Sequence, residues 1–311
     1  MVLLPGLVRS RSVPSRVRPC SETTGILRSG YYFDENDELV KALVTGSTGF
    51  VGRHLVEYLA ACGDEVAVTS RAEDHVDLLD ASTLTKAVAE ASPEVVFHLA
   101  GQANVSRSWE DPAGTLRVNV EGTLNLLAAA RSTGVERVVT VTSADIYGAV
   151  ALADLPIGEE TPLRPVSPYA VSKAAADLIA LQAHLGHGQD VVRARSFNHL
   201  GRGQSETTVC AALAARIAAN ERSGNGVVRV GNLEARRDFT DVRDAVRAYR
   251  MLAADGQAGT AYNVCSGQAI AVTELANQLL ALAEAPMHLE VDPTLLRPVD
   301  IQEFRGDPSR L

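Results

Sequence analysis

The stretch Ala42-Leu-Val-Thr-Gly-Ser-Thr-Gly-Phe-Val-Gly-Arg-His54 decides the fold of this chain. A short apolar run turns through Gly46, Gly49 and Gly52 into an amphipathic segment that begins at Phe50, a pattern typical of strand, tight turn and helix. The first glycine permits the turn, the second lets the backbone approach a pyrophosphate, and the third lets the helix pack closely on the strand. The stretch predicts a dinucleotide-binding fold, with a purely structural turn as the alternative.

The composition limits the classes of function. The 311 residues are 46% hydrophobic and 22% charged, which suits one large α/β domain or two interlocked ones. The formal charge of −9 argues against a general role at nucleic acids or membrane surfaces, and no apolar run approaches the length of a membrane span. The four cysteines lie far apart without metal-binding spacing, so we expect core thiols in a reducing cytoplasm and no metal site.

The chain changes character near residue 38. Residues 1–38 are basic and poor in acidic residues, so we expect a disordered extension there, with a transit peptide as the alternative. Beyond them, Val-rich runs alternate with helical stretches, which predicts right-handed βαβ units and a Rossmann-like, doubly wound parallel sheet. We expect a dinucleotide-binding domain over residues 39–195 and a smaller α/β substrate lobe over residues 196–311. The expected strands are 42–45, 65–69, 95–99, 137–142 and 190–194, and the expected helices are 50–62, 81–91, 112–133, 167–186 and 207–221.

The second expected strand carries a signal for the cofactor. It ends Val68-Thr-Ser-Arg71, where folds that select NAD usually place an acidic residue for the ribose 2′-hydroxyl. Ser70 and Arg71 instead offer a hydroxyl and a guanidinium, which suit the dianionic 2′-phosphate of NADP(H). We therefore favour NADP(H), with NAD(H) as the alternative. The alternative to a cofactor contact is that Arg71 is a solvated surface residue.

Three side chains suit a proton transfer coupled to carbonyl reduction. Ser143 lies at the end of the strand expected over residues 137–142. Tyr169 and Lys173 lie at positions i and i+4 of an expected helix, so these two side chains share one helical face. A free tyrosine has a pKa of about 10, and a nearby ammonium favours the phenolate. We expect Lys173 to tune Tyr169 in this way, while Ser143 hydrogen-bonds the carbonyl that is reduced.

Five motifs in this order resemble the extended short-chain dehydrogenases/reductases, the enzymes that modify nucleotide sugars. They are the glycine turn, Asp77-Leu-Leu-Asp80, His98-Leu-Ala100, the strand that ends at Ser143, and Pro168-Tyr-Ala-Val-Ser-Lys173. The resemblance covers Lys41 to the C-terminus. It implies that Asp77 and Leu78 touch the adenine, although Asp80 could equally cap a helix. The implied cofactor-binding residues are Gly46, Thr48, Gly49, Phe50, Val51, Gly52, Arg71, Asp77, Leu78, Leu99, Ala100, Tyr169 and Lys173.

Later segments narrow the resemblance to enzymes of GDP-6-deoxy-mannose metabolism, which dehydrate GDP-mannose or reduce its 4-keto-6-deoxy product. The segments are residues 195–204, 230–233 and 236–244. The resemblance implies a GDP-hexose substrate and a homodimer formed by the helices near 112–133 and 167–186. The implied substrate contacts are Asn198 and Arg237 at the sugar diphosphate, Asn232 at the guanine and Arg297 at a phosphate. Arg107 is a further candidate, with a plain surface charge as the alternative.

The choice between reductase and dehydratase depends on Asp145. A dehydratase needs an extra carboxylate, and Asp145 would point the same way as Ser143 if the strand continued. Dehydratases of the family usually carry Thr at the position of Ser143 and Glu at the position of Asp145. The Asp side chain is one methylene shorter than Glu, which spoils a proton transfer that needs hydrogen-bond distance. We favour the 4-keto reductase over a dehydratase, an epimerase or an inactive cofactor-binding homologue. The family also usually has Pro where this chain has Ser196 and Arg202. Relatives usually continue with a final helix where this chain ends at Leu311, and we interpret this difference as a truncation.

Overall fold

The computed structural model describes residues 39–71, 75–295 and 301–311. The expectations for residues 1–38 and for Arg297 lie outside these ranges. Residues 38–311 form one compact unit. Among the helices of the described ranges, none is both long and apolar enough to cross a bilayer.

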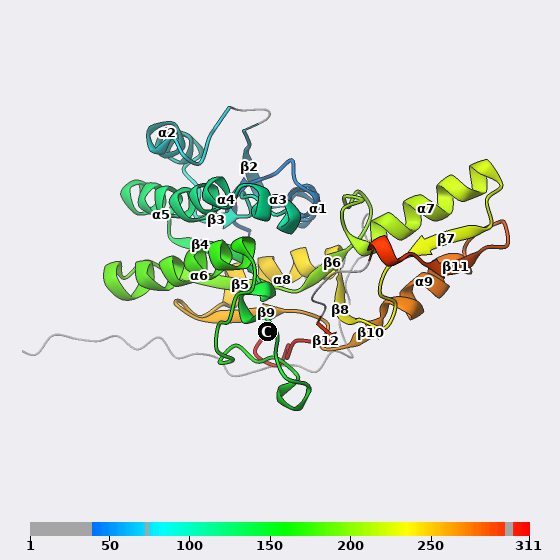
Figure 1. Ribbon diagram of the computed structural model, residues 1–311. Helices are drawn as coiled ribbons and strands as arrows, with labels where there is room; N and C mark the ends of the chain where they lie inside the picture. The colour runs from blue at the N-terminus through cyan, green and yellow to red at the C-terminus, as the bar shows by residue number, and fades with distance from the viewer. Residues whose placement is uncertain (1–38, 72–74, 296–300) are drawn as a thin grey trace, which may run out of the picture. The chain divides into compact units, whose positions relative to one another are not determined.

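A six-stranded sheet forms the centre of this unit, and all its neighbouring strands are parallel (Figure 1). Because the strand order reverses between β1 and β3, the carboxyl ends of these two strands form the topological switch point where such sheets bind ligands. The prediction of a Rossmann-like doubly wound sheet is confirmed. In spatial order the strands are β2 (Glu65–Thr69), β1 (Lys41–Thr45), β3 (Val95–His98), β4 (Arg137–Ser143), β5 (Val191–Ser196) and β9 (Ala261–Val264).

Helices pack on both faces of the sheet. On one face, α2 (Ala81–Ala91), α5 (Gly122–Thr133) and α6 (Pro168–His187) enclose a core of aliphatic side chains from β1, β3, β4 and β5. On the other face, α1 (Phe50–Cys62) packs against α8 (Val242–Asp255), which also contacts β4 and β5. The segment expected as one helix over 112–133 contains α4 (Pro112–Leu116), a π-helical turn over Arg117–Glu121 and α5, and α3 (Val105–Glu110) precedes it.

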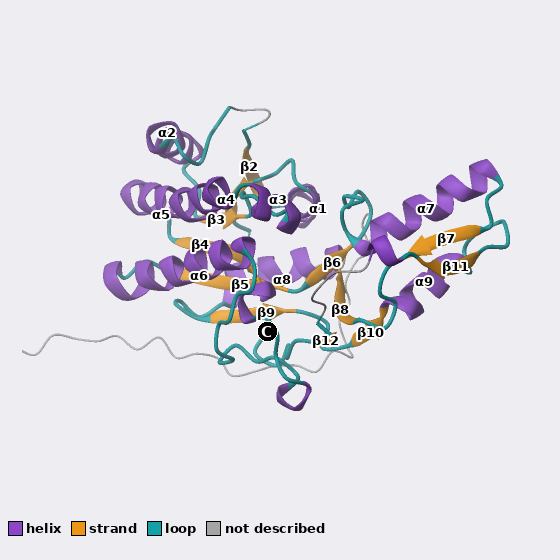
Figure 2. Ribbon diagram, in the orientation of Figure 1, coloured by secondary structure: helices purple, strands orange, loops and turns teal. Residues whose placement is uncertain are grey.

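Residues after β5 build smaller sheets. The strand β8 (Arg236–Asp241) pairs with β6 (Asn198–Leu200), β10 (Ala269–Ala271) and β12 (Glu303–Phe304). A separate pair, β7 (Val227–Val230) and β11 (His288–Val291), packs with α7 (Val209–Ser223) and α9 (Val272–Leu280), as Figure 2 shows. A turn over Pro293–Leu295 follows.

The structure differs from the predicted elements near Asp77 and in the main sheet, which includes β9. Residues 75–79, which include the predicted adenine contacts Asp77 and Leu78, form no strand, and their backbone turns toward the N-cap of α2. The Asp80 carboxylate caps that helix by accepting hydrogen bonds from the backbone N–H groups of Ser82 and Thr83. The strand β9 comes from the second half of the chain and completes the main sheet.

Candidate active site

The glycine turn lies at the switch point. Gly46 has φ = +75°, a conformation that favours glycine, and its carbonyl accepts a 3.0 Å hydrogen bond from the N–H of Gly49. A Cβ at Gly46 would lie 2.7 Å from the backbone nitrogen of Ala100 and 3.0 Å from the carbonyl carbon of Leu99. The turn after β1 and the end of β3 therefore touch, as the predicted cofactor residues require.

The features around this turn fit a dinucleotide pyrophosphate. Gly49 is the N-cap of α1 and supplies no side-chain cap, which leaves N–H groups at the helix start for a ligand. The buried hydroxyl of Ser47 has no hydrogen-bond partner among the described residues. A Cβ at Gly52 would overlap the carbonyl of Gly46, so only glycine permits this approach of helix to turn. Of the other predicted contacts here, Thr48, Phe50 and Val51 are half-buried.

A buried, neutral histidine, His98, links the elements around the glycine turn. One ring nitrogen of buried His98 lies 2.9 Å from Thr45 Oγ1, and the other lies 3.2 Å from Thr123 Oγ1. Burial, with a smaller contribution from the charge of Lys173, lowers the pKa of His98 from 6.5 to about 3. His98 is therefore a structural link between β1, β3 and α5.

The residues predicted to hold the adenosine end also come together. Arg71 Nε lies 3.4 Å from Asp77 Oδ2 at the surface, and the other carboxylate oxygen accepts a hydrogen bond from the N–H of Leu79. The carbonyl of Leu78 accepts a hydrogen bond from the Asn125 side chain in α5. A 2′-phosphate at Arg71 would meet a guanidinium that already has an acidic neighbour.

The three residues predicted to be catalytic, Ser143, Tyr169 and Lys173, are all buried. Ser143 ends β4, while the other two lie near the start of α6, where the Ser167 hydroxyl accepts a hydrogen bond from the N–H of Ala170 and Pro168 occupies the first turn. Lys173 Nζ donates to the carbonyl of Val141 in β4 at 3.1 Å. The cap and this bond place the helix beside the end of the strand.

The pKa of Tyr169 lies above its ordinary value. Burial and then the charge of Asp145 raise it, while a hydrogen bond with Ser143 lowers it in part. Burial lowers the pKa of Lys173 to about 8. Desolvation is the largest cause of this rise, and the expectation that Lys173 favours the phenolate stays a prediction. A phenol that stays protonated at neutral pH is the form that donates a proton to a ketone oxygen.

The strand before Asp145 does not continue to that residue. The strand β4 ends at Ser143, and residues Ala144–Tyr147 form a 3₁₀ turn. The N–H of Asp145 donates to the Ser143 hydroxyl at 3.2 Å. Asp145 therefore reaches the site from a turn, near enough for its charge to affect Tyr169.

Asn119 links two segments of the site from the π-helical turn. Its amide oxygen accepts from the N–H of Gln102, and its amide nitrogen donates to the carbonyl of Gln102 and to Ser172 Oγ in α6. A Cβ at Gly101 would lie 2.7 Å from Asn119 Oδ1 and 3.8 Å from Lys173 Nζ. The asparagine therefore fixes the loop after β3 beside Lys173, consistent with the tendency of π-turns to occur at functional sites.

Two of the expected substrate residues lie on one small sheet. Asn198 pairs with Phe239 across β6 and β8, and Arg237 lies two residues before Phe239 on the same face. Arg237 Nη1 donates to the carbonyls of Arg236 and Ile301. By contrast, Asn232 is exposed between β7 and β8, and Arg107 is exposed on α3.

A parallel sheet with a glycine turn at its switch point, and a Ser–Tyr–Lys set beside it, defines the short-chain dehydrogenase/reductase class. The chain belongs to the NAD dependent epimerase/dehydratase family, whose model matches residues 42–265.

Relatives of known activity cover most of the chain. It is 41% identical to a GDP-6-deoxy-D-mannose reductase of Pseudomonas aeruginosa, with 87% of this chain and 89% of the relative covered. It is 30% identical to a GDP-mannose 4,6-dehydratase of Vibrio cholerae, with 87% of each covered. The structure of RMD from Pseudomonas aeruginosa complexed with NADPH is similar with a TM-score of 0.80 and 40% identity, over 86% of this chain and 90% of that one. A Thermus thermophilus UDP-glucose 4-epimerase with NAD has a TM-score of 0.77 at 31% identity, over 86% and 91%.

Sequence reasoning missed several polar residues around the site. Ser196, the strand neighbour of Ser143, hydrogen-bonds the Tyr249 hydroxyl, which also lies 3.1 Å from His199 Nε2. Asp177 forms a buried ion cluster with two arginines of β5. The spacing of four residues from Lys173 to Asp177 could have revealed the latter, because it continues the helical face that begins at Tyr169.

Proposed function

We propose that this enzyme reduces the 4-keto group of GDP-4-keto-6-deoxy-D-mannose with NADPH, as a step in GDP-deoxyhexose synthesis. The observation that carries the proposal is the burial of the Tyr169 phenol with Ser143, which ends β4, and Lys173. The 41% identity to a GDP-6-deoxy-D-mannose reductase selects the sugar.

The mechanism assigns one task to each side chain. Ser143 donates a hydrogen bond to the ketone oxygen and polarises the carbonyl. When bound, the reduced nicotinamide supplies a hydride for C4. Tyr169 transfers its phenolic proton to the same ketone oxygen, so the product is an alcohol. Lys173, whose pKa falls to about 8 through burial, stabilises the phenolate that results.

For the cofactor, we propose that the free N–H groups at the start of α1 and the Ser47 hydroxyl bind the pyrophosphate. The open helix terminus and the unpartnered hydroxyl support this assignment. We propose Asp77 and Leu78 at the adenine and Arg71 at the 2′-phosphate, where a dianion would compete with Asp77 for the guanidinium. The NADPH complex of the similar Pseudomonas aeruginosa structure supports NADP(H) over NAD(H).

For the substrate, we propose that the segments after residue 196, other than α8 and β9, form the nucleotide-sugar lobe. Asn198 and Arg237 would bind the diphosphate, and their shared face on β6 and β8 supports this pairing. Asn232 remains the proposed guanine contact, and Arg107 a proposed sugar contact from α3. Arg297, the proposed phosphate clamp, lies outside the described residues.

We also propose a cytoplasmic homodimer. No disulfide joins the three cysteines within the described residues, which fits a reducing compartment. Apolar side chains remain exposed along α6, namely Val171 (43%), Leu178 (53%) and Leu185 (73%). They repeat every seven residues and form one helical stripe, which suits packing against a second copy.

Two parallel reactions test the proposed activity. One contains GDP-4-keto-6-deoxy-mannose and NADPH, and the other contains GDP-mannose and NADP⁺, with nicotinamide absorbance and the sugar product followed in both. NADPH consumption with the keto sugar alone supports the reductase. Conversion of GDP-mannose without net nicotinamide change would instead establish the dehydratase, with Asp145 as its extra carboxylate.

A further inference from the structure

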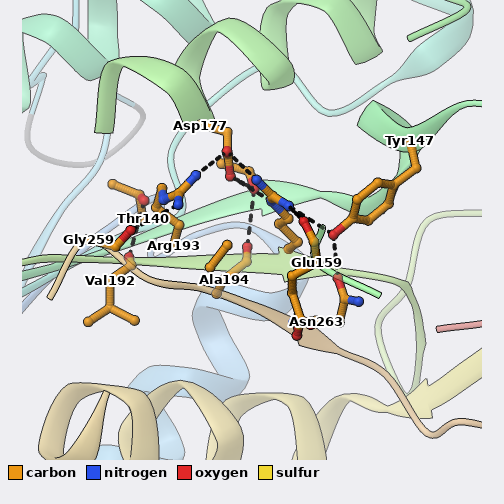
Figure 3. Close-up of polar contacts among 12 residues, drawn as sticks. Thr140, Tyr147, Glu159, Asp177, Val192, Arg193, Ala194, Gly259 and Asn263 are labelled. Atoms are coloured by element: carbon orange, nitrogen blue, oxygen red, sulfur yellow. Dashed lines mark hydrogen bonds and ion pairs between the residues drawn. The ribbon is translucent and has the colours of Figure 1, made fainter. Parts of the chain in front are cut away.

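A buried ion cluster joins the catalytic helix to the main sheet. The Asp177 side chain in α6 is 0% exposed, and its Oδ2 lies 2.6 Å from Arg193 Nη1 and 2.8 Å from Arg195 Nη2. Arg195 Nε also donates to Asp177 Oδ1 at 3.0 Å. Figure 3 shows the Asp177 carboxylate pointing from α6 toward β5, which carries both arginines.

The cluster continues the catalytic face of α6. Tyr169, Lys173 and Asp177 follow one another at intervals of four residues. All three lie beside the end of β4: Asp177 Oδ1 lies 3.4 Å from Thr142 Oγ1, Lys173 donates to the carbonyl of residue 141, and hydrogen bonding with Ser143 lowers the pKa of Tyr169. The position of the helix along this strand therefore sets the contact between phenol and serine.

The same cluster reaches the turn that carries Asp145. Arg195 Nη1 donates to the Tyr147 hydroxyl at 3.0 Å and to the carbonyl of Glu159 at 2.8 Å. The Tyr147 hydroxyl in turn donates to Asn263 Oδ1 in β9 at 2.7 Å. One carboxylate thus ties the helix, β5 and the 3₁₀ turn after Ser143 into a single arrangement.

Such a cluster is costly to bury. Two guanidinium groups share one carboxylate, and Arg193 Nε has no hydrogen-bond partner within the part of the chain that the structure describes. Buried ion pairs often contribute less to stability than well-packed apolar residues of the same volume, whereas removal of one partner leaves an unpaired buried charge. A role of the cluster in positioning the side chains of the site would account for the cost of burying it.

We propose that Asp177 is a positioning residue for the reduction, which rests on the proposed function: held by Arg193 and Arg195, it fixes α6 along β4 so that the Tyr169 hydroxyl contacts Ser143.

Asp177→Asn tests the proposal through kinetics. A displaced phenol loses alignment with the ketone, so kcat is expected to fall on the order of 10–100-fold while KM for both substrates stays within about threefold. The Ser143 hydrogen bond lowers the pKa of Tyr169, so its loss raises that pKa. The basic limb of the kcat–pH profile is therefore expected to move to higher pH.

Asp64→Asn provides a matched control. Asp64 Oδ2 lies 2.8 Å from Arg250 Nε in α8, and their side chains are 0% and 6% exposed, so this buried pair resembles the cluster without touching α6. We expect both variants to lose thermal stability and only the Asp177 variant to lose kcat and shift its pH profile. Equal kcat in the two variants, or equal losses in both, would reduce Asp177 to a structural residue.

A spectroscopic readout separates this inference from the proposed function. In protein labelled with 3-fluorotyrosine, the ¹⁹F resonance absent from Tyr169→Phe reports the surroundings of this phenol without turnover. We expect it to shift in Asp177→Asn but not in Asp64→Asn, even if the keto sugar is not a substrate; an unshifted resonance would overturn the inference. If Asp177→Asn does not fold, Arg195→Lys keeps a cation while losing the two-oxygen contact, and the same shift is expected.

Discussion

At the scale of single residues, the proposed mechanism assigns the central step to Tyr169. Its phenol is buried and its pKa raised, so it is protonated at neutral pH and can act as the acid. We predict that Tyr169→Phe lowers kcat by a factor on the order of 10²–10⁴. The affinity for NADPH, measured by fluorescence quenching, should change little. Unchanged kcat in this variant would remove Tyr169 from the mechanism.

Asp145 distinguishes the two candidate reactions. Its charge raises the pKa of Tyr169, so Asp145→Asn lowers that pKa. A reductase needs the protonated phenol and loses activity as pH rises through its pKa. We therefore predict that this variant keeps kcat within about threefold at pH 7 and that its basic limb moves to lower pH. Loss of all turnover at pH 7 would indicate a carboxylate that takes part in the reaction.

His98 gives the protein an acid-sensitive stability. Its pKa is near 6.5 when unfolded but about 3 in the folded protein, so between these values the unfolded state binds the extra proton. Stability should fall as pH drops below 6.5, by roughly 1.4 kcal/mol per pH unit from this residue. We predict that denaturant titrations of His98→Gln at pH 6.5 and 4.5 show a smaller difference than the wild type. An unchanged pH dependence would show that His98 is not the source.

At the scale of elements, α6 has two functional faces. One carries Tyr169, Lys173 and Asp177, and the other carries the exposed stripe that includes Leu178. We predict that Leu178→Glu converts the proposed dimer to a monomer in analytical ultracentrifugation, because a carboxylate opposes burial in an apolar contact. Leu282→Glu, at an 80% exposed position after α9, is the control and should stay dimeric. A dimer in both variants would locate the interface elsewhere.

The sequence predicts elements well where a single pattern decides them. The turn at Gly46 and the helix from Pro168 follow from glycine spacing and capping, and the structure contains both. The end of β4 at Ser143 is harder to predict. There the Ser143 hydroxyl accepts a hydrogen bond from the N–H of Asp145 and so caps the next turn. The π-helical turn depends on tertiary bonds of Asn119 to Gln102, which no local pattern reveals.

At the scale of the whole molecule, distant segments complete the main sheet and the site. The strand β9 belongs to the second half of the chain, and its Asn263 bonds Tyr147 next to the catalytic strand. Motif spacing can predict Ser143, Tyr169 and Lys173 because one strand and one helix supply them. It cannot predict Asp177 with Arg193 and Arg195 as one cluster, since that requires the pairing of α6 with β5.

The most direct measurement of the central claim follows the hydride. The enzyme is incubated with GDP-4-keto-6-deoxy-mannose and NADPH carrying two deuterium atoms at C4 of the nicotinamide, and the product is analysed by NMR and mass spectrometry. The account predicts one deuterium at C4 of the sugar, one NADPH consumed per product, and no transfer in Tyr169→Phe within the same time. A product without deuterium at C4, or deuterium transfer at the wild-type rate in Tyr169→Phe, would contradict it.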